Sequence, residues 1–232
     1  MIDLLTPIDV GHKKVRLGPP SDGGYVMPEI VLEKCSALFT YGVEADIRYE
    51  INFVKSYNKP AHMFDHTINQ PTGMIGENLF FYDEGLGFAN KCKDVIDHYD
   101  MIRPAGTILL KIDIEGNEYD YFDKVDIDRL ANITDGILIE IHWLTNSEYR
   151  VGCSRLIEKL RSHFTLCHVH GNNHSGVFEQ DEYMIPSVLE LSFINKKLVE
   201  IEKAETRKYP IKGLDFANVP TLPDYELSYI NR

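Results

Sequence analysis

Short apolar runs alternate with amphipathic stretches along most of the chain, and this alternation predicts the elements of an α/β fold. A short hydrophobic run that ends at a glycine or an aspartate is typical of a buried strand. A stretch in which apolar residues recur every three or four positions is typical of a helix packed on a sheet. The predicted strands are 36–41, 61–64, 79–82, 107–112, 136–141, 164–169 and 187–194, and the predicted helices are 46–57, 93–101, 118–130 and 154–163.

The order of these elements predicts a mostly parallel sheet with helices on both faces, because parallel strands need crossover connections. The last two strands break this order, since a loop rich in glycine and asparagine joins them, and we expect an antiparallel pair at a sheet edge. Glycine and proline punctuate residues 1–30, which predicts an irregular N-terminal cap. The tail 203–232 contains three prolines and is too small to fold alone, so we expect it to wrap around a single domain spanning 1–232.

Composition narrows the classes of protein that the chain can belong to. With 44% hydrophobic residues the 232-residue chain is not disordered, and its net charge of −12 argues against nucleic-acid binding or docking on an anionic membrane. No apolar run approaches the roughly 18 residues of a membrane span, and residues 1–10 lack the basic start of a signal peptide. The four cysteines form no C-x-x-C pair. We therefore expect a soluble cytoplasmic protein with reduced thiols, whose oligomeric state is left open.

The ends of the first two predicted strands carry a glycine and a carboxylate with a suggestive spacing. Gly42 follows the first strand, and Asp65 follows the second, 23 residues later. A glycine turn lets the backbone approach a ligand, and a carboxylate at this offset can accept both hydroxyls of a nucleoside ribose. The alternative is that Asp65 only caps a helix or turns the chain.

The charge of the first turn favours one class of nucleotide ligand over another. A nicotinamide-dependent oxidoreductase requires three glycines in G-x-G-x-x-G and a helix N-terminus free to bind pyrophosphate. Here one glycine is present, and Glu44 and Asp46 follow it. Carboxylates repel pyrophosphate but suit S-adenosylmethionine, which carries an ammonium and a sulfonium. An NAD(P)-dependent oxidoreductase remains the disfavoured alternative.

The segment Lys-Ile-Asp-Ile-Glu-Gly-Asn-Glu at 111–118 resembles the K-[IV]-D-[IV]-E-G-x-E signature of FkbM-type S-adenosylmethionine-dependent methyltransferases. The resemblance extends over about 16–193, although a second glycine that such families often keep in the first turn is replaced here. Further segments match in the same order, namely Asp22-Gly23-Gly24-Tyr25-Val26, Tyr41-Gly42-Val43, Phe64-Asp65, Gly85-Leu86-Gly87 and Ile139-Glu140-Ile141-His142.

This resemblance implies a class I, Rossmann-like methyltransferase: an α/β fold with seven mostly parallel strands, an antiparallel last strand and helices on both faces. It implies S-adenosylmethionine as donor and the hydroxyl of a small molecule or carbohydrate as acceptor. A non-catalytic module that keeps the fold is a further alternative. The predicted donor-binding residues are Asp22, Gly23, Gly24, Tyr41, Gly42, Val43, Glu44, Asp46, Asp65, Gly85 and Leu86, of which Asp22–Gly24 have the alternative of an ordinary Asp-Gly turn.

Three side chains beyond the fourth and fifth strands are candidates for the chemistry. Methyl transfer requires an acceptor oxygen aligned with the methyl carbon and a group that takes its proton. Asp113 and Glu115 can orient the hydroxyl or accept the proton, unless Asp113 caps the next helix and Glu115 faces solvent. His142 ends the neighbouring strand and is a candidate general base. Lys111, by contrast, is expected to be an edge or packing residue.

Imidazole and carboxylate groups at this rim also suggest a divalent metal, although their spacing matches no recognised ligand motif. The candidate metal ligands are Asp113, Glu140, His142 and His170. Aromatic residues that could stack on a sugar ring, or equally pack a loop, are Trp143, Tyr149, Phe178 and Tyr183.

Overall fold

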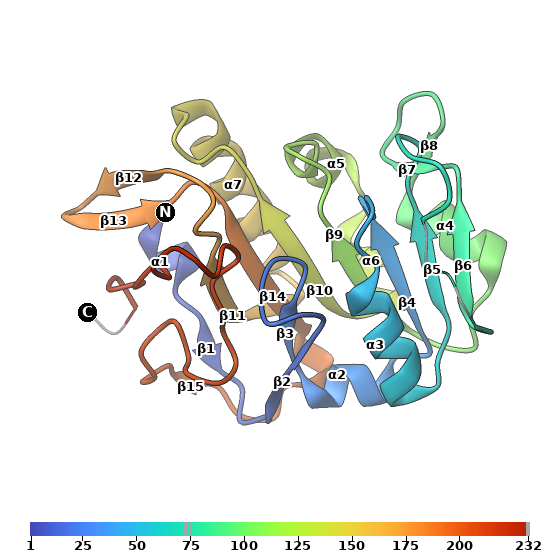
Figure 1. The fold of residues 1–232 in the computed structure, drawn as a ribbon, viewed down its shortest axis with the longest axis horizontal. Helices are drawn as coiled ribbons and strands as arrows, with labels where there is room; N and C mark the ends of the chain where they lie inside the picture. The colour runs from blue at the N-terminus through green and yellow to red at the C-terminus, as the bar shows by residue number, and fades with distance from the viewer. Residues whose placement is uncertain (72–73, 75, 231–232) are drawn as a thin grey trace.

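One seven-stranded mixed sheet forms the centre of the computed structural model, which describes residues 1–71, 74 and 76–230 (Figure 1). The strand order is β11-β14-β10-β9-β4-β5-β6, and every pairing is parallel except those of β14. This confirms the predicted α/β fold of the class I methyltransferase type. The strands are β4 (Ala37–Tyr41), β5 (Ala61–Phe64), β6 (Leu79–Tyr82), β9 (Ile108–Ile112), β10 (Thr134–Ile141), β11 (Phe164–Gly171) and β14 (Leu189–Asn195).

The antiparallel pair that we expected at a sheet edge is formed by β11 and β14. Within this pair β11 is the edge strand, and β14 lies between β10 and β11. All seven residues of β14 are buried, because the strand is covered by neighbours on both sides and on both faces. The segment between them contains no helix, as expected, but forms a small hairpin of β12 (Val177–Gln180) and β13 (Tyr183–Pro186).

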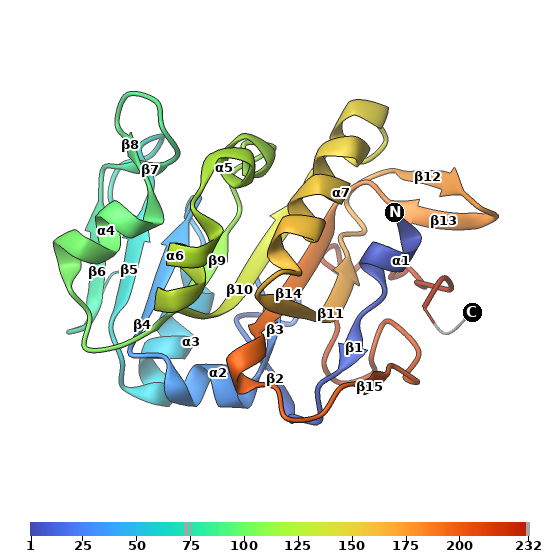
Figure 2. The same ribbon diagram turned by 180° about the vertical axis from the view of Figure 1, so that it is seen from behind.

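Helices cover both faces of the sheet (Figures 1 and 2). The predicted helix 118–130 is broken in two, because the Asp126 side chain accepts the N–H of Arg129 and caps a new helix after the extended residue Val125. One face carries α2 (Glu29–Lys34) and α3 (Arg48–Tyr57); the other carries α4 (Val95–Ile102), α5 (Glu118–Lys124), α6 (Ile127–Ile133) and α7 (Ser147–Leu160).

The expectation of an irregular N-terminal cap is wrong. Residues 1–30 contain α1 (Ile2–Leu5), β1 (Ile8–Asp9) and a hairpin of β2 (Lys14–Leu17) and β3 (Tyr25–Pro28). Distant residues stabilise these elements: the Ser192 hydroxyl on β14 donates to the Val26 carbonyl at 2.6 Å, and β1 pairs with β15 (Lys203–Ala204). Such contacts leave no local signal in the sequence. The remaining short elements are β7 (Gly85–Leu86), β8 (Cys92–Lys93) and the 3₁₀ helix η1 (Lys196–Leu198).

The C-terminal tail contributes to the core as well as covering the surface. Tyr209, Leu227 and Tyr229 are buried in the main hydrophobic cluster. Two buried histidines of β11 hold the tail by hydrogen bonds, His168 to Asp215 at 2.8 Å and His170 to Asp224 at 3.2 Å. The described residues include no helix long and apolar enough to cross a bilayer, and all four cysteines are free thiols.

The buried carboxylate of Glu205 in the C-terminal tail pairs with Lys14 and Arg207, and these pairs predict that the stability of the protein falls in acid. Burial opposes ionisation of Glu205, but Arg207 at 2.6 Å and Lys14 at 3.5 Å outweigh it and lower the pKa of Glu205 to about 2. A carboxyl group whose pKa is lower in the folded than in the unfolded protein stabilises the fold at pH values above its unfolded pKa. This contribution is lost as the pH falls through the folded pKa. We expect a loss of about 3 kcal/mol of unfolding free energy from this group between about pH 4.5 and 2.

Urea unfolding from pH 7 to 2.5 measures this loss. Glu205→Gln should be less stable at pH 7 and should show a flatter pH dependence than the wild type. Glu200→Gln, which changes an exposed carboxyl, is the matched control. Parallel pH curves for wild type and Glu205→Gln would contradict the assignment.

Candidate functional site

Two adjoining cavities open at the carboxyl ends of the parallel strands, with volumes of about 430 and 360 Å³. Gly42, Glu44, Asp113 and Glu115 line both, so the two cavities meet at the ends of β4 and β9. The larger, the acidic cavity, is also lined by Asp22, Gly23, Val43, Asp46, Lys111, Glu140 and His142, and the smaller, the apolar cavity, by Phe64, Asp65, Thr67, Gly85, Leu86, Phe88, Ile114 and Tyr121.

Gly42 allows the loops after β4 and β9 to touch. Its φ is +73°, and a Cβ atom at this position would lie 1.5 Å from the carbonyl oxygen of Asp113. The Asp113 N–H donates to the Tyr41 carbonyl at 3.0 Å, which fixes the two loops against each other. Any side chain here would displace the backbone of Asp113.

Asp65 holds the first turn in place. One carboxylate oxygen accepts the N–H groups of Val43 at 3.0 Å and Glu44 at 3.2 Å; the other accepts the N–H and the hydroxyl of Thr67 at 2.8 and 2.6 Å. Burial alone would raise the pKa of Asp65, but these hydrogen bonds lower it. The carboxylate therefore organises the turn, while it also faces the apolar cavity where we predicted the ribose.

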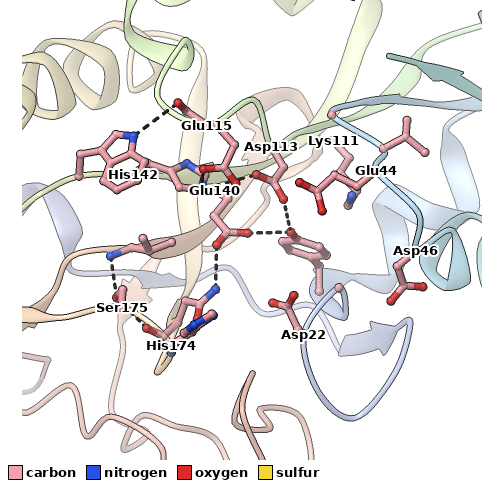
Figure 3. A pocket seen from close by; sticks show the side chains of 17 residues that line it. Asp22, Glu44, Asp46, Lys111, Asp113, Glu115, Glu140, His142, His174 and Ser175 are labelled. Carbon is pink, nitrogen blue, oxygen red and sulfur yellow. Dashed lines mark hydrogen bonds and ion pairs between the residues drawn. The ribbon is translucent and has the colours of Figure 1, made fainter. Parts of the chain in front are cut away.

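The lining of the larger cavity is strongly acidic, and Figure 3 shows its carboxylates directed at one space. Lys111 lies on the central strand β9 rather than at an edge, so that part of the expectation is wrong. Its buried stem was predicted correctly, and its ammonium lies 3.7 Å from the Glu50 carboxylate and 5.0 Å from the Tyr25 ring centre. The carboxylates are Asp22, Glu44, Asp46, Asp113, Glu115 and Glu140.

Asp113, Glu115 and His142 converge, as sequence reasoning anticipated. His142 Nε2 lies 3.6 Å from Asp113 Oδ1 and 3.6 Å from Glu115 Oε2. His142 Nδ1 lies 3.2 Å from Glu118 Oε1, which also accepts the N–H of Ile114 at 3.1 Å. Sequence reasoning missed the role of the fully buried Glu118, although this residue closes the motif at 111–118.

The surroundings of this group raise the pKa values of both Asp113 and His142. Burial raises the pKa of Asp113 to about 6, against the opposing effects of Lys111 and His142. Burial lowers the pKa of His142, but the hydrogen bond and charge of Glu118, together with Glu140, raise it to about 9. This environment favours the protonated form of His142, whose Nε2 atom would have to lose its proton before it acted as a base or as a metal ligand.

Tyr25 links the wall formed by β3 to this group. Its hydroxyl donates to Glu140 Oε2 at 2.9 Å and to Asp113 Oδ2 at 3.4 Å. Burial raises the pKa of Glu140 well above its usual range, and the neighbouring Asp113 raises it further. Tyr25 was quoted only as part of a matching segment, because its own segment was expected to be irregular.

Several predicted residues lie elsewhere. Tyr41 is a core residue, stacked on Phe64 and hydrogen-bonded to His98, and it lines neither cavity. Gly24 does not line them either. His170 is held between Glu190 and Asp224, away from the Asp113 group. Among the described residues, the group with metal-ligating atoms within 4.8 Å of one another is Asp113, Glu115 and His142, which leaves out Glu140 and His170. Of the four aromatic candidates, Trp143 lines the acidic cavity, whereas Tyr149, Phe178 and Tyr183 line neither of these two cavities.

Comparison with known proteins places the chain among distant structural neighbours only. No family model and no curated protein matches it. The alignment with a candidate hemolysin of Lactococcus lactis covers 72% of this chain and 81% of the hemolysin, with 12% identity and a TM-score of 0.45. Fibrillarin of Methanococcus jannaschii, a pre-rRNA processing protein, covers 72% and 69% at 13% identity and a TM-score of 0.41. A candidate tRNA (m1A22) methyltransferase of Streptococcus pneumoniae, in complex with S-adenosyl-L-methionine, covers 72% and 71% at 11% identity and a TM-score of 0.40.

Proposed function

We propose that this protein is an S-adenosylmethionine-dependent O-methyltransferase of the FkbM type. The observation that carries the proposal is the junction of an apolar and an acidic cavity at Gly42 and Asp113. The adenosine would occupy the apolar cavity, beside Gly85 and Leu86, with its ribose near Asp65. The methionine end, with its ammonium and sulfonium, would reach into the acidic cavity, where carboxylates complement positive charge.

The hydrogen bonds of the first turn argue against an NAD(P)-dependent oxidoreductase. A pyrophosphate is bound by free N–H groups at this turn. Here the N–H groups of Val43 and Glu44 already donate to Asp65, and the side chains of Glu44 and Asp46 add negative charge. A dinucleotide would have to displace Asp65 and approach three carboxylates.

Asp113 is the group that we assign to the acceptor hydroxyl. A lone pair of the acceptor oxygen forms the new bond to the methyl carbon, and the carbon–sulfur bond breaks with its electron pair left on sulfur. The hydroxyl proton goes to the Asp113 carboxylate. Glu115 borders the same space, and His142, held by Glu118, directs its Nε2 atom to within 3.6 Å of Asp113 Oδ1.

The acceptor that the acidic cavity favours is an uncharged small molecule or carbohydrate. Its acidic lining repels the phosphates of nucleic acids and nucleotides. Trp143, 47% exposed at the rim, offers an aromatic face to a sugar ring, and Asn172 and Ser175 offer polar groups to hydroxyls. Mass-spectrometric detection of methyl transfer from S-adenosylmethionine to a panel of glycosides, with RNA oligonucleotides in parallel, tests this proposal. Methylated RNA without methylated glycosides would overturn it.

We expect Asp65→Ala to weaken the binding of S-adenosylhomocysteine by about 2 to 3 kcal/mol, because the variant loses charge-assisted hydrogen bonds and frees the first turn. Calorimetry measures the affinity. Asp83→Ala, which removes an exposed carboxylate paired with Lys91, is the control and should bind like the wild type. Unchanged affinity in Asp65→Ala would remove Asp65 from the donor site.

A further inference from the structure

We propose that Asp113, Glu115 and His142 bind one divalent ion of the first transition row at the junction of the two cavities. The three side chains each present one ligand atom, and these atoms lie within 4.8 Å of one another. They come from two neighbouring loops, after β9 and after β10, so that a single ion could bridge the ends of both strands.

One buried atom at this place lacks the hydrogen bond that such atoms normally make: Asp113 Oδ1 is buried and has no hydrogen-bond partner among the described residues. Beside it lies His142, whose side chain is only 6% exposed and whose Nε2 atom is 3.6 Å from Asp113 Oδ1 and from Glu115 Oε2, beyond hydrogen-bonding distance. One cation between these three atoms would give Asp113 Oδ1 the partner that it lacks and would also bind Nε2 and Glu115.

The opposite nitrogen of His142 is held as it would be in a metal site. Histidines that ligate a metal almost always donate their other ring N–H to a carboxylate or carbonyl, which fixes the ring and its tautomer. Here Nδ1 faces the fully buried carboxylate of Glu118 at 3.2 Å. Glu118 is itself fixed by the Ile114 N–H, so the direction of Nε2 into the junction is built into the start of α5.

The ligand types select the class of ion. One imidazole nitrogen with two carboxylate oxygens departs from the all-oxygen sets that Mg²⁺ and Ca²⁺ prefer, and it suits transition ions that accept both donor types. Within that series the expected affinity rises from Mn²⁺ to Cu²⁺ and falls again at Zn²⁺, which still binds more tightly than Mn²⁺. Three protein ligands would leave further coordination positions for water or an acceptor oxygen.

The metal site deepens the proposed function, and only the role of the ion in methyl transfer rests on that function. An ion at this junction could hold the acceptor oxygen beside the donor methyl group and make its proton easier to remove. Binding of the ion itself is independent of methyl transfer and can be measured alone.

The test is the binding of Mn²⁺ to the full chain after treatment with a chelator. Binding is measured by equilibrium dialysis and by the loss of the free Mn²⁺ signal in electron paramagnetic resonance. We expect one Mn²⁺ per chain, tighter binding of Zn²⁺ than of Mn²⁺, and weaker binding of Mg²⁺ than of either. Glu115→Gln, at a 61% exposed side chain that does not threaten folding, and Asp113→Asn should each weaken Mn²⁺ binding by at least tenfold. Glu118→Gln should weaken it by about 10- to 100-fold through the orientation of His142.

Glu148→Gln, an exposed carboxyl outside both cavities, is the matched control and should leave Mn²⁺ binding unchanged. Wild-type affinity in Glu115→Gln, equal affinities for Mg²⁺ and Mn²⁺, or no saturable binding would each overturn the site. Calorimetry of S-adenosylhomocysteine on the same metal-free protein separates the two hypotheses. Donor binding without Mn²⁺ binding would refute only the metal site, and Mn²⁺ binding without donor binding would refute only the proposed function.

Discussion

Asp113→Asn is expected to lower turnover by about 100- to 10,000-fold, the usual effect of losing a positioned proton acceptor. The carboxamide keeps the shape of the side chain and its contact with Tyr25, 3.4 Å away, but it cannot take the proton of the acceptor. The affinity for S-adenosylhomocysteine should stay near that of the wild type, because the donor site that we propose is formed by the turn at Gly42 and the apolar cavity. A loss of rate without a loss of donor binding is the signature of a group that acts on the acceptor.

The measurement is single-turnover methyl transfer on the identified acceptor, with calorimetry of donor-product binding on the same samples. Asp100→Asn changes an exposed carboxylate on α4 and is the control for the loss of one negative charge. If the Asp113 variant turned over at the wild-type rate, the proton would have to go to another group, and Glu115 would be next. Full rescue by excess Mn²⁺ would instead assign Asp113 to ion binding alone.

The order of the central elements could be predicted from the sequence because each strand is a local apolar run. The run of β9, for example, is buried over all five residues and reads as a strand without any knowledge of its neighbours. The hairpin β2–β3 has no such signal, since its stability comes from β14, more than 160 residues further along the chain. The insertion of β14 between β10 and β11 is likewise a property of pairing, to which the sequence of β14 gives no guide.

The candidate site was predictable to the same extent. Asp113 and His142 stand at strand ends, where parallel strands bring side chains together, so their meeting followed from the order of the elements. Glu118 was missed because the direction of the first residue of a helix depends on where the preceding loop turns. The raised pKa of His142 could not be foreseen, because the contact with Glu118 that raises it spans 24 residues of the chain.

Gly42→Ala is expected to disrupt the site by displacing the backbone of the loops after β4 and β9. The new Cβ would lie 1.5 Å from the Asp113 carbonyl oxygen, an atom of the main chain that cannot rotate away. The left-handed φ of +73° adds strain of about 1 to 2 kcal/mol, and forcing the loops apart adds about 1 to 3 kcal/mol. We expect a loss of about 2 to 5 kcal/mol in the free energy of unfolding, together with loss of S-adenosylhomocysteine binding and of methyl transfer.

Gly213→Ala separates the two contributions, because Gly213 has a similar φ of +85°, but a Cβ added there would meet no atom of the described residues within 4 Å. This variant should show only the conformational strain of about 1 to 2 kcal/mol and should keep wild-type donor binding. Urea unfolding and calorimetry on both variants give the comparison. If Gly42→Ala were no less stable than Gly213→Ala and bound the donor product normally, the contact between the loops after β4 and β9 would not be what shapes the site, and the junction of the two cavities would lose its role in the proposed chemistry.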